Sequence, residues 1–237
     1  MPLFLFDPTF WLVVGPFLAL AAWCSMRVKT TFHEFQRVGV RSGMTGAQAA
    51  AAVARAGGAS VRIERVGGFL TDHYDPKTRT LRLSPDVYDG RSIASIAVAA
   101  HEAGHAIQHE QEYAFLTFRS NMVPLTIVGN VAWGPLFFIG LMLSWMGAAF
   151  GTGIALLGVA LFGLTVLFQI VTLPVEFDAS RRAKRVLAGT GIVATEEEAR
   201  GVSKVLSAAA MTYVAGALVS LAHLLYYLMI LLGSRDE

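Results

Sequence analysis

Residues 120–175 are SNMVPLTIVGNVAWGPLFFIGLMLSWMGAAFGTGIALLGVALFGLTVLFQIVTLPV, a run of 56 residues without a charged side chain. A helix that spans a bilayer needs about 20 mostly apolar residues, so this run is long enough for two such helices. Three glycines between residues 147 and 153 predict a tight turn between the two helices. We therefore expect membrane-spanning helices at about Leu125–Met146 and Ile154–Leu173.

Two further stretches, Pro8–Met26 and Val205–Ser234, also lack charge. They predict a first span at about Phe10–Met26 and a fourth at about Tyr213–Leu232. Hydrophobic residues make up 54% of the chain and charged residues 15%, against roughly 25% charged residues in an average soluble domain. The alternative is a soluble enzyme with buried core helices, but a soluble fold rarely contains so long an uncharged run. We expect a mainly α-helical membrane protein with four transmembrane helices.

The distribution of basic residues predicts the orientation. With four spans, Arg27–Arg119 and Glu176–Lys204 lie on one side of the membrane, and together they hold 18 of the 19 Lys and Arg residues. Because positive loops stay inside, this side is expected to be cytoplasmic in a multi-pass protein of the cell membrane. The net charge of +2 does not indicate a nucleic-acid partner, since topology and anionic lipid headgroups explain the basic residues. The expected organisation is a first transmembrane helix in residues 1–26, a cytoplasmic segment in 27–119, transmembrane helices two and three in 120–175, a cytoplasmic helix in 176–204, and a fourth transmembrane helix with a short tail in 205–237.

The cytoplasmic segment 27–119 has the pattern of a small α+β domain. An Ala-rich helix is expected up to Arg55, with Thr45 as its N-cap. Alternating and turn-forming residues then predict strands and a β-hairpin, followed by a helix. The expected elements are a strand at Val61–Val66, a second strand at Phe69–Tyr74, a turn at Asp75–Thr78, a third strand at Thr80–Ser84 and a helix from about Arg91 to Tyr113.

The last of these helices contains His101-Glu102-Ala103-Gly104-His105, which is an H-E-x-x-H motif. Residues four apart lie on one face of a helix, so His101 and His105 can bind one zinc ion. Glu102 is then in reach of a water on that ion and is expected to act as the general base. Gly104 lowers helix stability, which makes sense if something must approach the backbone closely at this position. The alternative is a helix whose histidines face solvent or ordinary neighbours.

A catalytic zinc site uses three protein ligands and keeps one open position. His109 lies about 12 Å from His101 along the helix axis, too far for one ion. Glu176 is the better candidate, because it is the first charged residue after the third span and lies on the same side as His101. Leu173–Arg182 is expected to begin a new helix at the membrane surface, where Glu176 could instead simply favour the helix N-terminus. Asp178 is the reserve ligand.

Five long strings of the sequence are characteristic: Arg41-Ser42-Gly43-Met44-Thr45-Gly46-Ala47, Leu70-Thr71-Asp72-His73-Tyr74-Asp75-Pro76, Leu81-Arg82-Leu83-Ser84-Pro85-Asp86-Val87-Tyr88, Val98-Ala99-Ala100-His101-Glu102-Ala103-Gly104-His105-Ala106-Ile107-Gln108-His109 and Leu173-Pro174-Val175-Glu176-Phe177. Through them the chain resembles the YugP-like neutral zinc metallopeptidases of bacteria over nearly its whole length. This resemblance implies a membrane zinc peptidase with one catalytic zinc ion.

A looser similarity links the chain to the HtpX and CAAX-prenyl-protease group. Those enzymes use H-E-x-x-H with a later Glu in an E-F/Y-x-A-D string, which supports Glu176 as the third, gluzincin-like ligand. The final Asp of that string is Ser180 here, so its supporting role beside the metal passes to Ser180 or another residue. We expect His109, Asp178 and Ser180 to lie around the metal ligands.

Zincins of this kind bind extended substrate along an edge strand that precedes the motif helix. Leu81, Arg82, Leu83 and Ser84 are in the corresponding place, so we expect them to bind the peptide backbone. His73, on the neighbouring strand, could donate a hydrogen bond to the oxyanion. A structural histidine is an equally good interpretation of His73.

The sequence therefore predicts a zinc endopeptidase that acts on membrane or membrane-proximal proteins or peptides. Intramembrane cleavage of the site-2 type is disfavoured, because charged residues such as Asp89, Arg91, Glu110 and Arg119 flank the motif closely. The alternative outside the enzymes is a membrane scaffold or transporter with a structural metal site. Such a site would be closed by four ligands and would not need Glu102.

Overall fold

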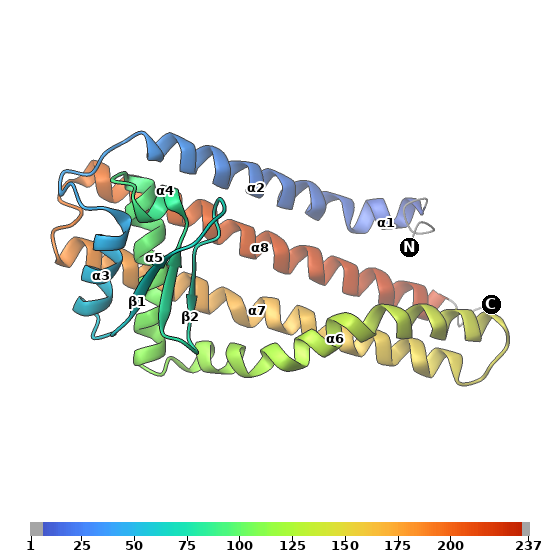
Figure 1. The fold of residues 1–237 in the computed structure, drawn as a ribbon. Coiled ribbons are helices and arrows are strands. Elements are labelled where there is room, and N and C mark those ends of the chain that lie inside the picture. Colours follow the sequence, from blue (N-terminus) through green and yellow to red (C-terminus); the bar gives the residue numbers. More distant parts are fainter. Residues whose placement is uncertain (1–6, 234–237) are drawn as a thin grey trace. The chain divides into compact units, whose positions relative to one another are not determined.

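A computed structural model describes residues 7–233, most of which are helical (Figure 1). The elements of the described part of the chain are α1 (Pro8–Val13), α2 (Gly15–Gln36), α3 (Gly46–Ala56), β1 (Arg62–Arg65), β2 (His73–Asp75), β3 (Thr80–Leu83), α4 (Pro85–Tyr88), α5 (Ile93–Glu110), α6 (Ala114–Trp145), α7 (Gly151–Gly189) and α8 (Glu196–Gly233).

The described residues divide into two compact units, which we treat separately. The helical unit takes in the described parts of residues 1–23, 118–172 and 213–237. The mixed unit takes in residues 24–117 and 173–212, and it contains the sheet and the H-E-x-x-H helix.

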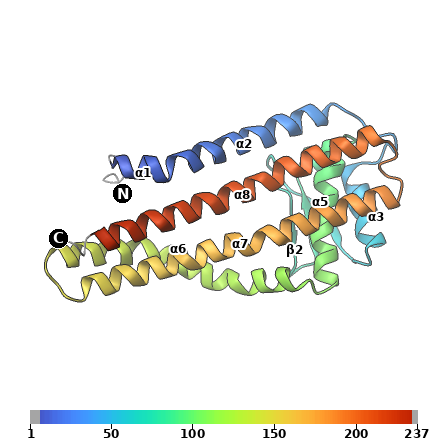
Figure 2. The same ribbon diagram turned by 180° about the vertical axis from the view of Figure 1, so that it is seen from behind.

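In the helical unit, α6, α7 and α8 run alongside one another and share an apolar core (Figure 2). Phe137 of α6, Val159 of α7 and Tyr226 of α8 are all buried in that core. A β-carbon on Gly158 would lie 2.6 Å from the backbone nitrogen of Phe137, so only a glycine lets α6 and α7 approach this closely. Many large apolar side chains of the unit point outward instead, and Val131 is one of them, 74% exposed.

Three described helices are long and apolar enough to cross a membrane by length and composition: α6, α7 and α8. These three helices contain the predicted second, third and fourth spans. The predicted first span, Phe10–Met26, is not among them. The helix is interrupted at Val14, two residues before Pro16, which has no N–H to donate. The longer piece, α2, also carries Arg27 and Lys29. Membrane crossing by the first segment stays a prediction.

The mixed unit is built around a three-stranded sheet with the order β1-β3-β2. β1 pairs parallel to β3, with Ile63 opposite Leu81, and β2 pairs antiparallel to β3, with Tyr74 opposite Leu81. β3 is therefore the central strand, and its backbone groups are used by neighbours on both sides. The expectation that Leu81–Ser84 lies at an edge of the sheet is therefore wrong, and substrate binding by these residues stays a prediction. The free edges of the described sheet belong to β1 and β2.

Two elements of the mixed unit begin later than predicted. The predicted strand Phe69–Tyr74 is reduced to β2, because Gly68 (φ 110°) and Leu70 (φ 54°) adopt left-handed conformations that cannot continue a strand. α5 starts at Ile93 because Ser92 caps it by accepting a hydrogen bond from the backbone N–H of Ser95. The prediction that Thr45 caps the Ala-rich helix is confirmed, since Thr45 and Gln48 form a capping box at the start of α3.

The expectation of a new helix at Leu173–Arg182 is wrong, because α7 continues through Pro174 to Gly189. Pro174 removes one backbone hydrogen bond, but the residues beyond it keep one apolar face buried. Val175, Ala179 and Ala183 lie four residues apart and are each fully buried. This stripe packs α7 into the mixed unit and carries the helix past the proline.

Candidate metal centre

The centre lies where α5 meets the second half of α7. Both helices present small residues at the crossing: Gly104 on α5 and Ala179 on α7. His101 and His105 occupy successive turns of α5, and Glu176 lies on α7 three residues before Ala179. The crossing therefore brings together two segments that are about 75 residues apart in the chain.

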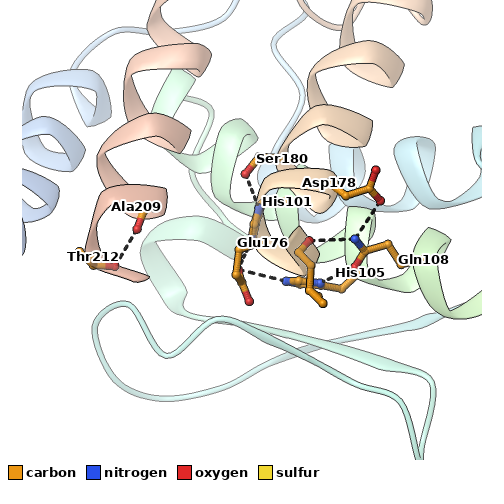
Figure 3. A network of polar contacts seen from close by, with 9 residues as sticks. His101, His105, Gln108, Glu176, Asp178, Ser180, Ala209 and Thr212 are labelled. Atoms are coloured by element: carbon orange, nitrogen blue, oxygen red, sulfur yellow. Dashed lines mark hydrogen bonds and ion pairs between the residues drawn. The ribbon is translucent and has the colours of Figure 1, made fainter. Parts of the chain in front are cut away.

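Three side chains converge at this crossing (Figure 3). Nε2 of His101 lies 3.2 Å and Nε2 of His105 lies 3.6 Å from Oε2 of Glu176. One ligand atom from each residue can be chosen so that all lie within 4.8 Å of one another. Two ligands held at about 2.0–2.1 Å from a tetrahedral zinc ion are roughly 3.3–3.4 Å apart. The spacing and the chemistry of this donor set therefore fit a zinc ion.

Each histidine is also held through its other ring nitrogen. Nδ1 of His101 lies 3.0 Å from the hydroxyl of Ser180. Nδ1 of His105 lies 3.0 Å from Oε1 of Gln108. A metal-ligating histidine commonly donates its second N–H in this way, which fixes the ring and leaves the opposite nitrogen for the metal.

Asp178, the reserve ligand, is not one of the three converging residues, but it accepts a hydrogen bond from Gln108, which contacts His105. Its Oδ2 accepts a hydrogen bond from Nε2 of Gln108 at 2.9 Å and a second one from Nε of Arg182. The guanidinium of Arg182 also donates to Gln111 and lies 5.5 Å from the centre of the Tyr113 ring. Asp178 is thus a link between an arginine and the amide behind His105.

His109 also lies outside the converging group. Its Nδ1 forms a 2.8 Å hydrogen bond with the hydroxyl of Tyr74, which is on β2. This hydrogen bond connects the last turn of α5 with strand β2 of the sheet. The structure therefore gives His109 a position one turn beyond His105 and a protein partner of its own.

The electrostatics of the His105 ring reflect two opposing effects. Burial disfavours the charged imidazolium, but the contact with Glu176 and the negative charges of Glu176 and Glu102 outweigh it, so the pKa of His105 is raised. A buried anionic cluster of this kind favours a cation at the crossing. A metal ion and a proton would compete for the same nitrogen.

Glu102, the predicted general base, is buried on α5 directly after His101. A second carboxylate, Asp72, lies close enough for their negative charges to interact. Burial, with a smaller contribution from Glu102, raises the pKa of Asp72. Oδ1 of Asp72 accepts from the backbone N–H of Ser84 at 2.7 Å and from its hydroxyl at 3.0 Å. The N–H of Ser84 is therefore not available to a substrate.

His73 lies exposed on β2, and its Nδ1 contacts the carbonyl oxygen of Thr71 at 2.8 Å. A carbonyl oxygen only accepts, so this Nδ1 carries the proton in the contact. Nε2 of neutral His73 then has no proton to donate. A donation to an oxyanion would require the charged imidazolium.

Sequence reasoning missed two residues of this site, Gln108 and Asp72. Gln108 is fully buried and lies three residues after His105, on the same face of α5. That spacing was a usable signal. Asp72 had no comparable signal, because it approaches Glu102 only through the fold of the loop between β1 and β2.

Comparisons with known proteins identify the family of this chain. Residues 10–232 match the family described as "Putative neutral zinc metallopeptidase". The chain is 48% identical over 223 residues to the "Putative membrane protease YugP" of Bacillus subtilis (strain 168), which covers 93% of this chain and 95% of the relative. No solved structure matches the chain.

Proposed function

This chain belongs to the neutral zinc metallopeptidase family, and from that premise we propose that it is a zinc-dependent endopeptidase of the cell membrane that hydrolyses peptide bonds of membrane or membrane-proximal proteins. The observation that carries this proposal is the convergence of His101, His105 and Glu176 within 4.8 Å. These residues would hold the metal, with Nε2 of each histidine and Oε2 of the carboxylate as ligand atoms.

A bound zinc ion supplies a Lewis acid that lowers the pKa of water toward about 7. Glu102 then takes the proton of the attacking water and passes it to the leaving amine, as a general base and afterwards a general acid. Burial of Glu102 keeps bulk water away from this proton transfer.

The competing function is a membrane scaffold or transporter with a structural zinc ion. Structural zinc sites are closed by four protein ligands. The group among residues 7–233 that could hold a metal ion has three members, His101, His105 and Glu176. A three-ligand site that keeps a position open, beside a buried carboxylate that is not a ligand, favours catalysis.

For the substrate, we propose pairing along the free edge of β2 instead of along β3. β2 is an edge strand of the described sheet, and Tyr74 connects it to α5 one turn beyond His105. An extended peptide can add to such an edge through backbone hydrogen bonds.

We also propose that the metal centre faces the cytoplasm. α6 and α7 are joined by a short turn, so the chain before α6 and the chain after α7 emerge on one side if both helices cross the membrane. This argument holds whether or not the first segment crosses. The basic residues of these two segments favour the cytoplasmic side.

The decisive experiment compares the full-length wild type with Glu102→Gln in detergent micelles. Zinc content by elemental analysis should be one ion per chain in both proteins. Hydrolysis of a quenched fluorescent peptide library should fall by about 10²–10⁴-fold in Glu102→Gln. Hydrolysis that survives in Glu102→Gln would refute the proposed mechanism.

A further inference from the structure

We infer that Gln108 is a positioning residue whose amide fixes the proton of His105 on Nδ1 and leaves the Nε2 lone pair facing Glu176. This inference rests on the proposed metal site and adds to it a residue that determines which nitrogen of His105 can bind the ion. The contacts of the Gln108 side chain carry the argument (Figure 3).

The amide nitrogen of Gln108 has two partners that can only accept hydrogen bonds. Nε2 lies 2.8 Å from the carbonyl oxygen of Val175 and 2.9 Å from Oδ2 of Asp178. The carbonyl oxygen of Val175 has no proton to donate, and Oδ2 of Asp178 already accepts from Nε of Arg182. Exchanging the nitrogen and oxygen of the amide would place its oxygen against two acceptors. The orientation of the Gln108 amide is therefore determined by its partners.

Because the amide nitrogen of Gln108 is hydrogen-bonded to residues of α7, its Oε1 faces the His105 ring. Oε1 lies 3.0 Å from Nδ1 of His105 and can only accept. Nδ1 must therefore carry the proton. The neutral ring then has its lone pair on Nε2, the atom 3.6 Å from Oε2 of Glu176.

The partner of the other histidine does not have this property. The hydroxyl of Ser180 contacts Nδ1 of His101 at 3.0 Å and can either donate or accept, because a hydroxyl does both. Ser180 is thus compatible with either neutral form of His101. Of these two partners, only Gln108 selects one form of its histidine.

A role in packing alone does not explain this side chain. Gln108 is fully buried between two helices, where an apolar residue of similar length would avoid the cost of desolvating an amide. The amide donates two hydrogen bonds, both to residues of α7, and accepts one hydrogen bond, from the His105 ring. Such a fully satisfied polar network specifies one arrangement of its members.

The experiment compares Gln108→Met with Gln111→Met in the full-length protein in detergent. Gln111 is the matched control, because it is an exposed glutamine whose Oε1 accepts from Arg182 instead of facing the His105 ring. Competition with a chromogenic chelator should show zinc binding about 10–100-fold weaker in Gln108→Met and unchanged in Gln111→Met. The visible spectrum of the Co²⁺-substituted protein should change only in Gln108→Met, since it reports ligand geometry.

A purely structural role predicts a different result: Gln108→Met would melt at a lower temperature but keep wild-type zinc affinity and the wild-type Co²⁺ spectrum. That result overturns the inference. If Gln108→Met does not fold, ¹⁵N NMR of the His105 ring in the zinc-free wild type decides, with assignment from His105→Ala. The measurement is made on the neutral ring, where the single proton is expected on Nδ1, and a neutral ring with its proton on Nε2 overturns the inference. Absence of zinc binding by the wild type would instead refute the proposed function, and the NMR measurement would still test Gln108.

Discussion

A β-carbon placed on Gly104 would lie 2.5 Å from the carbonyl oxygen of Ala179, closer than real β-carbons approach any backbone atom. The H-E-x-x-H helix and the helix that carries Glu176 therefore touch backbone to backbone at this point. Gly104 lies inside the motif, one residue before His105, and Ala179 lies three residues after Glu176. The absence of one side chain thus sets the separation of the three proposed metal ligands.

Gly104→Ala should accordingly damage the centre. Overpacking a tight contact typically costs about 1–3 kcal/mol, and this outweighs the helix-propensity gain of about 1 kcal/mol from replacing glycine. We expect a lower melting temperature and weaker zinc binding, measured by a thermal shift assay and by chelator competition.

Gly189→Ala is the control for this substitution. Gly189 ends α7, and nothing lies within 4 Å of the position of its added β-carbon. The change in stability should stay within about 0.5 kcal/mol. If Gly104→Ala keeps the stability and the zinc affinity of the wild type, α5 and α7 can move apart without affecting the centre, and the prediction is wrong.

Zinc stoichiometry should separate Glu176 from its neighbour Asp178. Glu176→Ala removes a ligand atom and should bind no stoichiometric zinc, whereas Asp178→Ala should still bind one ion. Zinc at 100 times its Kd should stabilise the wild type by about 2.7 kcal/mol, and this gain should disappear in Glu176→Ala and on treatment with a chelator. Tight binding by Glu176→Ala together with loss in Asp178→Ala would reverse the assignment of the third ligand.

Ser180→Ala should weaken zinc binding, because it removes the hydroxyl 3.0 Å from Nδ1 of His101. Loss of such a partner typically costs about 10-fold or more in metal affinity. Ser207→Ala, at an exposed position of α8, is the control and should have no effect. Equal zinc affinities of the two variants would show that the Ser180 contact contributes nothing to binding.

Asp72→Asn should make the protein more stable than the wild type as pH rises. Burial raises the pKa of Asp72 in the folded state above its unfolded value near 3.8. The unfolded chain therefore loses this proton first, and wild-type stability falls as pH rises from the unfolded pKa through the folded one. Asparagine can still accept from Ser84 but has no such titration.

Melting temperatures of the two proteins should therefore converge near pH 4 or below and differ at neutral pH, with Asp72→Asn the higher. Chelated, zinc-free samples serve as the control, because they exclude an effect through the metal. A wild type that gains stability relative to Asp72→Asn as pH rises would contradict the direction of the shift.

The orientation can be tested by labelling single cysteines in intact cells, after replacing Cys24, the sole native cysteine. Ser60, after α3, and Ala149, in the turn between α6 and α7, are both exposed. A membrane-impermeant thiol reagent should label Ala149→Cys directly and Ser60→Cys only after permeabilisation. The reverse pattern would place the metal centre outside the cell.

Some of the site could be predicted from local pattern. His101 and His105 are four residues apart in a helical segment, so helix periodicity alone brings their rings to one face. Glu176 was selected by its position after a hydrophobic run and by family resemblance, and the structure brings its carboxylate to both imidazoles. Gln108 was missed although its spacing from His105 is the same kind of signal.

The sheet shows where local pattern fails. The alternation at Thr80–Ser84 predicts a strand, and β3 is one, but alternation does not encode which strands lie on either side. The order β1-β3-β2 depends on pairing between distant segments, and it makes β3 central. Local pattern also fails at Pro174, where it predicts the start of a new helix. The helix continues because burial of Val175 and Ala179 outweighs the local effect of the proline.

The amino-acid sequence by itself determined the long apolar helices, the H-E-x-x-H helix and the basic segments between them. These features follow from hydropathy, periodicity and charge within a single stretch of chain. Only the tertiary structure decided the order of the strands, the contact of Gly104 with Ala179 and the orientation of the Gln108 amide. Each of these depends on the position of partners many residues away, and no local preference of the chain specifies such a position.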